Sequence, residues 1–153
     1  MDYEKNPWLS TEANRFLNSY VNQDTKILEF GAGGSTVWFS GRTKHLITIE
    51  HDNNWYQKMS PQVDTDIRLL PRPYYGVCDE FKDESFDLIL IDGRDRIRCI
   101  EKAHSKVKPD GILMLDNSER DIYSAVHEIL ATWKMKNTIE NPLWHTSWWR
   151  KPL

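Results

Sequence analysis

The sequence has few cysteines and no long apolar run. Cys78 and Cys99 stand twenty-one residues apart, without a C-x-x-C pair. A structural zinc site and a disulfide scaffold are therefore not expected. Residues 1–7 form no apolar signal segment, and no stretch approaches the length of a membrane span. We expect a cytoplasmic protein that has no membrane partner.

An excess of positive charge is also missing. Lysine and arginine number 20 against 23 acidic residues, a formal net charge of -3. This balance gives no general attraction to nucleic acid, so no nucleic-acid partner is expected. The chain shows no repeat, low-complexity tract or linker, and its 153 residues suffice for one core. We expect a single domain over residues 1–153.

The most informative stretch is Lys26–Gly34, where a short apolar run ends in glycines. This pattern predicts a strand, a tight turn and the start of a helix, at which the backbone approaches a ligand closely. A dinucleotide fingerprint would carry a third glycine where Thr36 stands. The hydride-transfer interpretation is therefore weakened.

Glu50 follows Gly31 by nineteen positions and closes a second apolar run. An acid at the end of the second strand is well placed to accept hydrogen bonds from ribose hydroxyls. Here the chain resembles the class I S-adenosylmethionine-dependent methyltransferases. Glu29-Phe-Gly-Ala-Gly33 matches their first motif, Glu50 matches their ribose-binding acid, and the resemblance covers nearly the whole chain from Lys26 onward.

Strand and helix patterns alternate along the chain, which predicts a parallel sheet with right-handed crossovers. The resemblance implies an α/β, three-layer Rossmann-like methyltransferase fold, with a mostly parallel seven-stranded sheet and an antiparallel C-terminal hairpin. The later expected elements are strands 67–70, 86–92 and 112–115, helices 97–107 and 122–133, and hairpin strands 138–140 and 146–150.

Acidic residues stand at or beside the expected ends of four strands: Glu29, Glu50, Asp92 and Asp116. They should converge at one edge of a parallel sheet. Carboxylates there are costly unless they meet a cation, a hydroxyl or a proton. S-adenosylmethionine carries a sulfonium, an ammonium and two ribose hydroxyls, so an acidic rim suits it.

The resemblance also implies roles around the glycine turn. Glu29 would act near the amino-acid end of the cofactor, and Gly31 and Gly33 would allow its close approach. Ser35 and Thr36 would bind its carboxylate or merely cap the helix. His51 would line the adenine side of the site or stand as a solvated turn residue.

A second group suggests a metal ion. Asp92, Asp116 and Asn117 offer three oxygen ligands at neighbouring strand ends, which suits Mg²⁺. They resemble the metal triad of catechol-type O-methyltransferases, although the lysine expected after the first acid is absent and Arg94 and Arg96 stand nearby. An Asp-Asn turn explains the pair equally simply.

The expected function is methyl transfer from S-adenosylmethionine to a small-molecule acceptor, with Asp92 catalytic or substrate-orienting and metal-assisted O-methylation as one form. Alternatives are an aminopropyl transferase or lyase on the same scaffold, and a non-catalytic cofactor-binding module. The acceptor pocket would come from the N-terminal helix, nearby loops or a second subunit in a homodimer. Trp148 and Trp149 should point to opposite faces of their strand.

Overall fold

The computed structural model describes residues 7–120, 123–141 and 144–153. The strands are β1 (Ile27–Phe30), β2 (Leu46–Glu50), β3 (Asp66–Leu69), β4 (Phe86–Ile91), β5 (Val107–Asp116), β6 (Lys134–Asn141) and β7 (Trp144–Arg150). The α-helices are α1 (Thr11–Tyr20), α2 (Gly34–Ser40), α3 (Asn53–Met59), α4 (Arg96–Ala103) and α5 (Val126–Ile129). The described residues also form the 3-10 turns η2 (Ser60–Gln62), η3 (Tyr75–Glu80) and η4 (His104–Lys106).

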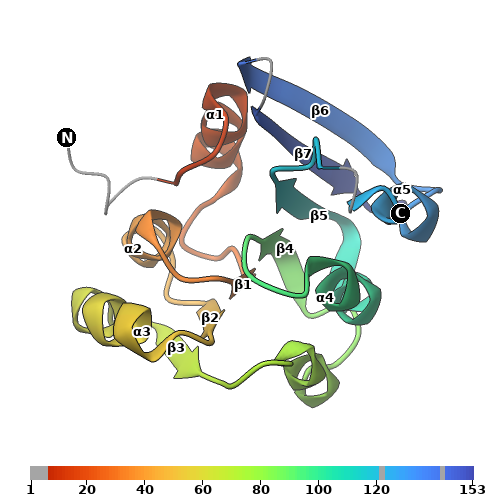
Figure 1. The fold of residues 1–153 in the computed structure, drawn as a ribbon. Coiled ribbons are helices and arrows are strands. Elements are labelled where there is room, and N and C mark those ends of the chain that lie inside the picture. Colours follow the sequence, from red (N-terminus) through yellow and green to blue (C-terminus); the bar gives the residue numbers. More distant parts are fainter. Residues whose placement is uncertain (1–6, 121–122, 142–143) are drawn as a thin grey trace.

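One seven-stranded sheet organises these elements, in the order β3-β2-β1-β4-β5-β7-β6. The first five strands run parallel, whereas β7 lies antiparallel to both β5 and β6. Figure 1 looks onto the edge where the parallel strands end. The predicted Rossmann-like sheet with an antiparallel C-terminal hairpin is confirmed.

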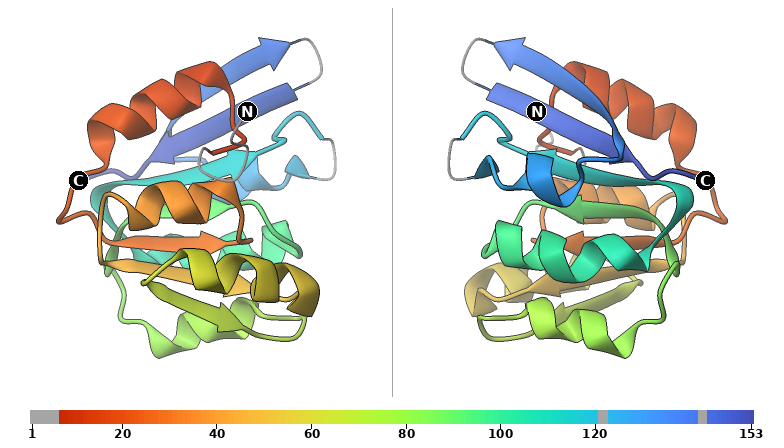
Figure 2. Two further views of the ribbon diagram at one scale, coloured as in Figure 1. Left: turned by 90° about the vertical axis from the view of Figure 1, so that its left-hand side faces the viewer. Right: turned by 90° about the vertical axis from the view of Figure 1, so that its right-hand side faces the viewer.

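Two hydrophobic clusters cover the two faces of the sheet. Side chains alternate between the faces, so Leu88 and Leu90 of β4 join the cluster under α1 and α2, and Ile89 and Ile91 join the cluster under α4 and α5. Figure 2 shows α1, α2 and α3 in front in one view and α4 and α5 in front in the other. A strand buried on both faces is apolar without alternation, as β4 is.

The two tryptophans of β7 follow the same rule. Trp148 packs with α1 and stacks on Phe16 at 4.7 Å between ring centroids, whereas Trp149 belongs to the cluster under α5. Their predicted placement on opposite faces is confirmed. Both are buried, so in this structure they serve packing.

Helix α1 begins after a serine cap and buries an apolar stripe. Ser10 lies before the first turn, and its hydroxyl accepts the N–H of Ala13 at 3.1 Å. Ala13 and Leu17, one turn apart, are fully buried. The helix therefore packs its apolar stripe on the sheet, as the helical spacing indicates.

Two elements differ from expectation. The helix predicted over 122–133 is reduced to α5 (Val126–Ile129), with Asp121 and Ile122 outside the described residues. Ser118, ahead of this helix, bonds Ser147 of β7 at 2.7 Å. Strand β5 begins at Val107, ahead of the expected start at residue 112, because Val107 already pairs with Phe86 of β4. Tertiary contacts override local propensity at both places.

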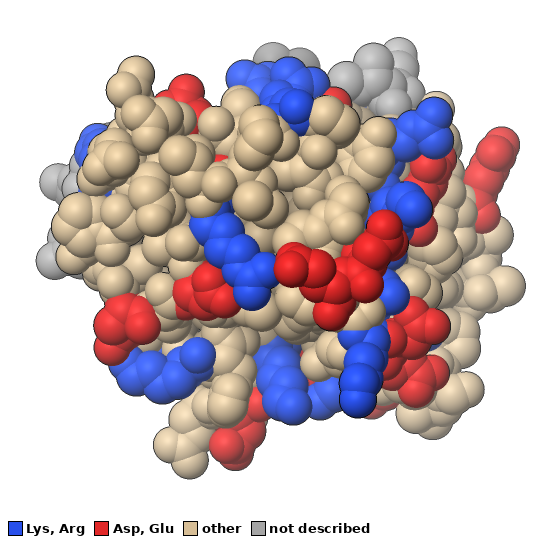
Figure 3. Space-filling model, turned by 90° about the horizontal axis from the view of Figure 1, so that it is seen from below, with Lys and Arg blue, Asp and Glu red and all other residues tan. Residues whose placement is uncertain are grey.

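Charged side chains of both signs lie next to each other on the face seen from below in Figure 1 (Figure 3). Ion pairs of the structure include Arg68 with Asp66 and Glu80, and Lys106 with Asp83. This face therefore presents no broad area of a single sign. Among the described residues, no helix has the length and apolar character needed to cross a membrane.

Candidate functional site

The strand ends converge as the sequence predicts. β1 lies between β2 and β4, and β4 neighbours β5, so Glu50, Asp92 and Asp116 lie along one edge. Desolvation raises the pKa of Asp92, because a carboxyl removed from water favours its neutral form. The negative charges of Asp116 and Glu29 raise it further.

The glycine turn divides its two glycines between different tasks. Gly31 has φ +98°, and a Cβ there would lie 2.5 Å from the carbonyl oxygen of Asp92. Only glycine fits at position 31, because the turn after β1 lies in close contact with the end of β4. At Gly33 a Cβ would meet nothing within 4 Å. Open space beside Gly33 is where a ligand can approach the backbone.

Glu50 holds this turn from the side of β2. Its buried carboxylate accepts the N–H of Ala32 at 3.0 Å and those of His51 and Asp52 at 2.8 Å. His51 Nδ1 lies 3.3 Å from the same carboxylate. An ionised carboxylate has about four acceptor positions, so it serves the backbone and retains some capacity for a ligand hydroxyl.

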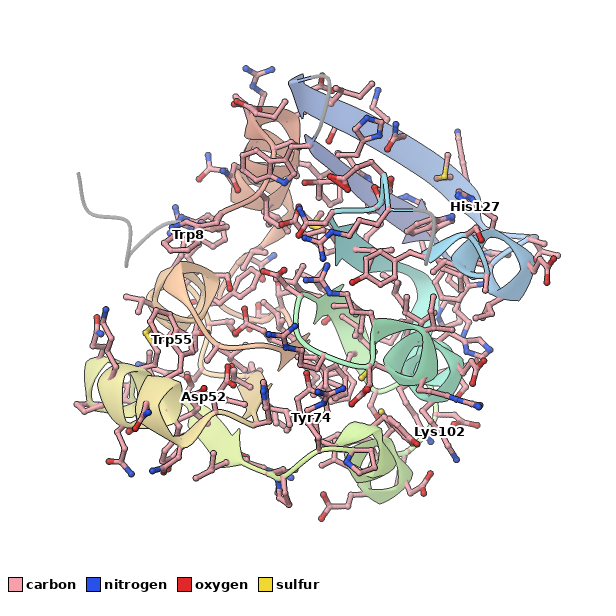
Figure 4. The ribbon with its side chains drawn as sticks, in the orientation of Figure 1. Trp8, Asp52, Trp55, Tyr74, Lys102 and His127 are labelled. Carbon is pink, nitrogen blue, oxygen red and sulfur yellow. The ribbon has the colours of Figure 1, made fainter. Side chains whose placement is uncertain are left out.

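Aromatic side chains border the same edge. Figure 4 shows Trp55 and Asp52 at α3, Trp8 beside α2, and Tyr74 between β3 and α4. The indole N–H of Trp55 donates to the carbonyl of Ala32 in the glycine turn. Helix α3 and strand β2 thus hold the turn together.

Tyr74, in the segment between β3 and η3, is a core residue. Its side chain is buried and packs edge-on against Phe30 at 5.5 Å and His51 at 6.0 Å between ring centroids. Its hydroxyl accepts the backbone N–H of Arg94 at 2.5 Å. Tyr74 therefore packs against His51 and supports its position.

Glu29 lies beneath the site and does not face it. Its fully buried carboxyl accepts hydroxyl hydrogens from Ser35, from Thr36 at 2.6 Å and from Thr48 at 3.0 Å. Burial raises its pKa to about 7, against the lowering effect of these bonds. In this structure Glu29, Ser35 and Thr36 fasten α2 to the sheet, and their expected roles at the cofactor stay predictions.

Arg96 stands between the two acids proposed as metal ligands. Its guanidinium lies 3.2 Å from the Asp92 carboxylate and donates at 2.6 Å to the backbone carbonyl of Asp116. It also donates to the carbonyl of Gly93 at 3.0 Å. A cation of the chain itself therefore bridges these strand ends.

The other ligands are also engaged. Asp116 Oδ1 accepts the indole N–H of Trp144 at 2.9 Å and the hydroxyl of Thr146 at 2.8 Å. Asn117 takes a left-handed turn conformation with φ 54°. Across the described residues, no cluster of three or more His, Cys, Asp or Glu is arranged to hold a metal. These residues do not fit a metal site, and the Mg²⁺ expectation has no support here.

Sequence reasoning missed the threonines that satisfy the buried acids. Thr48 lies opposite Glu29 in the β1–β2 register, and Thr146 lies opposite Asp116 in the β5–β7 register. Each hydroxyl bonds the acid of the neighbouring strand. For Thr48, its position as a lone threonine within a largely apolar strand is the sequence signal that would have indicated such a partner, whereas Thr146 stands beside other polar residues of β7 and gives no such signal.

Solved structures share this architecture at low sequence identity. An rRNA methylase from Streptococcus thermophilus superposes with TM-score 0.71 and 12% identity, covering 93% of this chain and 95% of its own. A tRNA methyltransferase from Aquifex aeolicus has TM-score 0.70 and 12% identity, covering 100% and 74%. Spermidine synthase from Thermotoga maritima has TM-score 0.61 and 17% identity, covering 86% and 55%. At these identities the likeness shows the fold.

The expectation of no nucleic-acid partner is corrected by these structures. Two of them carry names of enzymes that act on rRNA and tRNA. A fold shared with such proteins does not support an exclusion drawn from the net charge of -3. Overall charge was a poor guide because a local basic surface is compatible with an acidic total.

A search among curated proteins found no match. A family model described as a methyltransferase domain matches residues 28–118, the stretch from β1 to the end of β5 that carries the glycine turn and the acidic strand ends. The chain therefore belongs to the methyltransferase-domain family, with the class I Rossmann-like fold.

Proposed function

We propose that residues 1–153 act as one domain that binds S-adenosylmethionine and transfers its methyl group to an acceptor. The observation that carries the proposal is the open glycine turn: Gly33 faces empty space, and the Glu50 carboxylate lies against the same turn. A cofactor with ribose hydroxyls and cationic groups fits a backbone cradle edged by carboxylates.

The cofactor would supply an electrophilic methyl group on its sulfonium. Glu50 would accept hydrogen bonds from the ribose, with His51 beside it. Gly31 would hold the cradle against the end of β4, where Asp92 is about a third exposed in its side chain, at 31%. Asp92 would orient the acceptor beside the cofactor, because holding the two reactants in the right geometry accelerates methyl transfer.

Binding is tested first by calorimetric titration with S-adenosylmethionine and S-adenosylhomocysteine, with NAD as a control. Micromolar binding of the sulfonium pair alone supports the proposal, and its absence refutes it. Repetition with Mg²⁺ and with EDTA is expected to give equal affinities, because Arg96 already bridges the acidic strand ends.

Turnover distinguishes the remaining functions. Methyl transfer releases S-adenosylhomocysteine, whereas aminopropyl transfer releases methylthioadenosine. A small-molecule panel and a panel of RNA and DNA should be assayed in parallel, because the fold occurs in nucleic-acid methylases. Binding without turnover on either panel would favour a non-catalytic module.

The ribose assignment is tested by Glu50→Ala. We expect the dissociation constant for S-adenosylhomocysteine to rise at least tenfold, about 1.4 kcal/mol. Asp52→Ala is the matched control: it removes a neighbouring charge and the cap of α3, where Asp52 accepts the N–H of Trp55 at 2.8 Å. Unchanged affinity in Glu50→Ala, or an equal loss in Asp52→Ala, would remove the assignment.

A further inference from the structure

A basic feature lies beside Asp92, at the edge of the sheet where the parallel strands end. A cavity of about 330 Å³ opens between the β4–α4 loop, the first turn of α4 and the segment after β5. Among the described residues, its charged lining consists of Arg72, Arg94, Arg96, Arg98 and Arg120, with Asp95 as the acid. Asp92 and Glu101 pair with Arg96 and Arg98, so five guanidiniums against three carboxylates leave a local charge of +2, opposite in sign to the chain as a whole.

Three of these arginines already have acidic partners. Arg72 contacts Asp95 at 2.7 Å, Arg96 contacts Asp92 at 3.2 Å, and Arg98 contacts Glu101 at 3.0 Å. The arginines of these ion pairs line the cavity. Arg96 also lies over the ring of Tyr123, 5.3 Å from its centroid, so that its fork is held in place.

The other two are available to a ligand. Arg94 and Arg120 are exposed, and within the parts of the chain that the structure describes neither side chain has an acid within ion-pair distance. Like charges gathered around one space repel one another, and an anion between them relieves that repulsion. Guanidinium forks match the oxygens of phosphate in pairs.

The cavity also lies where an acceptor would have to be. Gly93 lines it, next to Asp92 at the end of β4, and the charges of Arg96 and Arg120 both act on Asp92. Asp92 in turn touches the glycine turn through Gly31. The basic cavity and the proposed cofactor cradle therefore flank the same strand end.

We propose that this cavity binds a phosphate group of the methyl acceptor, so that the substrate class is phosphorylated. The inference rests on the proposed function. At about 330 Å³ the cavity admits a phosphate with a small part of the molecule attached. The phosphate belongs either to a free nucleotide-like molecule or to the backbone of a polynucleotide.

The test uses two probes on the full chain: inorganic pyrophosphate in calorimetry and a short fluorescein-labelled single-stranded RNA in anisotropy. At least one probe should bind the wild type. The double variant Arg94→Ala/Arg120→Ala should weaken that binding by about tenfold or more. Arg94→Lys/Arg120→Lys should retain part of the affinity, because it keeps the charges and loses the forks.

The matched control is Arg15→Ala/Arg42→Ala, which removes two arginines at α1 and after α2, on the opposite face of the sheet. It should change the affinity by less than about twofold if the cavity is specific. Failure of both probes to bind, or an equal loss in the control, would overturn the proposal. Thermal unfolding of each variant verifies that the fold is intact.

The two proposals fail separately. S-adenosylhomocysteine should bind wild type and Arg94→Ala/Arg120→Ala alike. Cofactor binding without any phosphate binding would overturn the proposal of a phosphate site and leave the proposed methyltransferase function intact. Phosphate binding without cofactor binding would overturn the proposed function and leave the phosphate site. Among positive results, pyrophosphate alone indicates a free phosphorylated acceptor, and RNA alone, with an affinity that falls log-linearly with salt, indicates a polynucleotide.

Discussion

The two glycines of the turn after β1, Gly31 and Gly33, should respond differently to substitution by alanine. Gly31→Ala places a Cβ 2.5 Å from the Asp92 carbonyl at φ +98°. We expect it to lower the free energy of unfolding by about 2 to 4 kcal/mol. Urea denaturation measures this directly.

Gly33→Ala is the matched control, since its Cβ enters open space from an extended backbone. Its stability should stay within about 0.5 kcal/mol of wild type. Its affinity for S-adenosylhomocysteine should fall, because the methyl group occupies the space in which the cofactor would approach. A destabilised Gly33→Ala or a stable Gly31→Ala would contradict this division of tasks.

Glu29 should make stability depend on pH. Its pKa in the folded protein is raised from 4.5 to about 7, so the folded state retains a proton that the unfolded state releases. Its contribution is present in full below pH 4.5 and is lost as pH rises through 7. Relative to Glu29→Gln, the wild type should lose about 3 kcal/mol of unfolding free energy between pH 4.5 and pH 8.

Urea midpoints of both proteins across this range supply the measurement. Glu29→Gln keeps the size of the side chain and carries no titrating proton, so a parallel pH profile for the two proteins would show that Glu29 is ionised at no extra cost. Such a result would contradict the buried, neutral carboxyl inferred here.

At the residue level, sequence reasoning was most successful where one position determines the chemistry. The order of Gly31, Gly33 and Glu50 along the chain was enough to indicate a cradle next to an acid. The task of Glu29 was not predictable in the same way, because its partners come from α2 and from Thr48 on the neighbouring strand. That pairing depends on register, which a single sequence does not state.

At the scale of elements, Ser10 connects α1 to the hairpin. Its hydroxyl caps α1 through Ala13 and bonds the Thr138 hydroxyl at 2.5 Å, and its N–H donates to Thr146 Oγ1 at 3.0 Å. We expect Ser10→Ala to lower the free energy of unfolding by about 1 to 2 kcal/mol, because the cap and a buried partner are lost together.

The control is Ser19→Ala in the same helix, where the exposed hydroxyl bonds only the carbonyl of Phe16, a local contact at 3.0 Å. Its effect should stay within about 0.5 kcal/mol. Chemical denaturation compares the two variants. Equal effects would show that the helix cap and the link to the hairpin are worth no more than a surface hydroxyl.

Elements with strong periodic or continuous patterns, such as α1 and β4, were predictable from the sequence. The segment after β5 was not, although its apolar residues recur at helical spacing. Val126 and Leu130 are buried, yet the helical turn ends at Ile129 and β6 begins at Lys134. Because β6 begins on β7 at Lys134, residues 130–133 form the turn that leads into that strand and do not continue the helix.

At the scale of the whole molecule, cofactor binding should raise thermal stability. A ligand that binds the folded state alone adds about 2.7 kcal/mol at one hundred times its dissociation constant. For a chain of this size that corresponds to a rise in Tm of about 5 to 10 °C. Thermal scans with S-adenosylhomocysteine measure it, NAD should give no shift, and an equal shift with NAD would contradict the choice of cofactor.

The antiparallel C-terminal hairpin was predicted, whereas the order of the strands across the sheet was not. Periodicity locates strands along the chain, whereas their order across the sheet depends on long-range contacts that leave no local mark. The basic cavity escaped prediction for the same reason, because Arg72, Arg94 and Arg120 come from three separate segments. Only the fold brings their charges to one place.

The placement of β7 has a consequence for how the protein is made. It follows β6 in the chain yet lies between β5 and β6, so β6 has no neighbour on the sheet until β7 has been inserted. α1 contacts this hairpin through Ser10 and Thr11, with partners up to 136 residues away. On the ribosome α1 can therefore complete its contacts with the hairpin only after β7 has been synthesised.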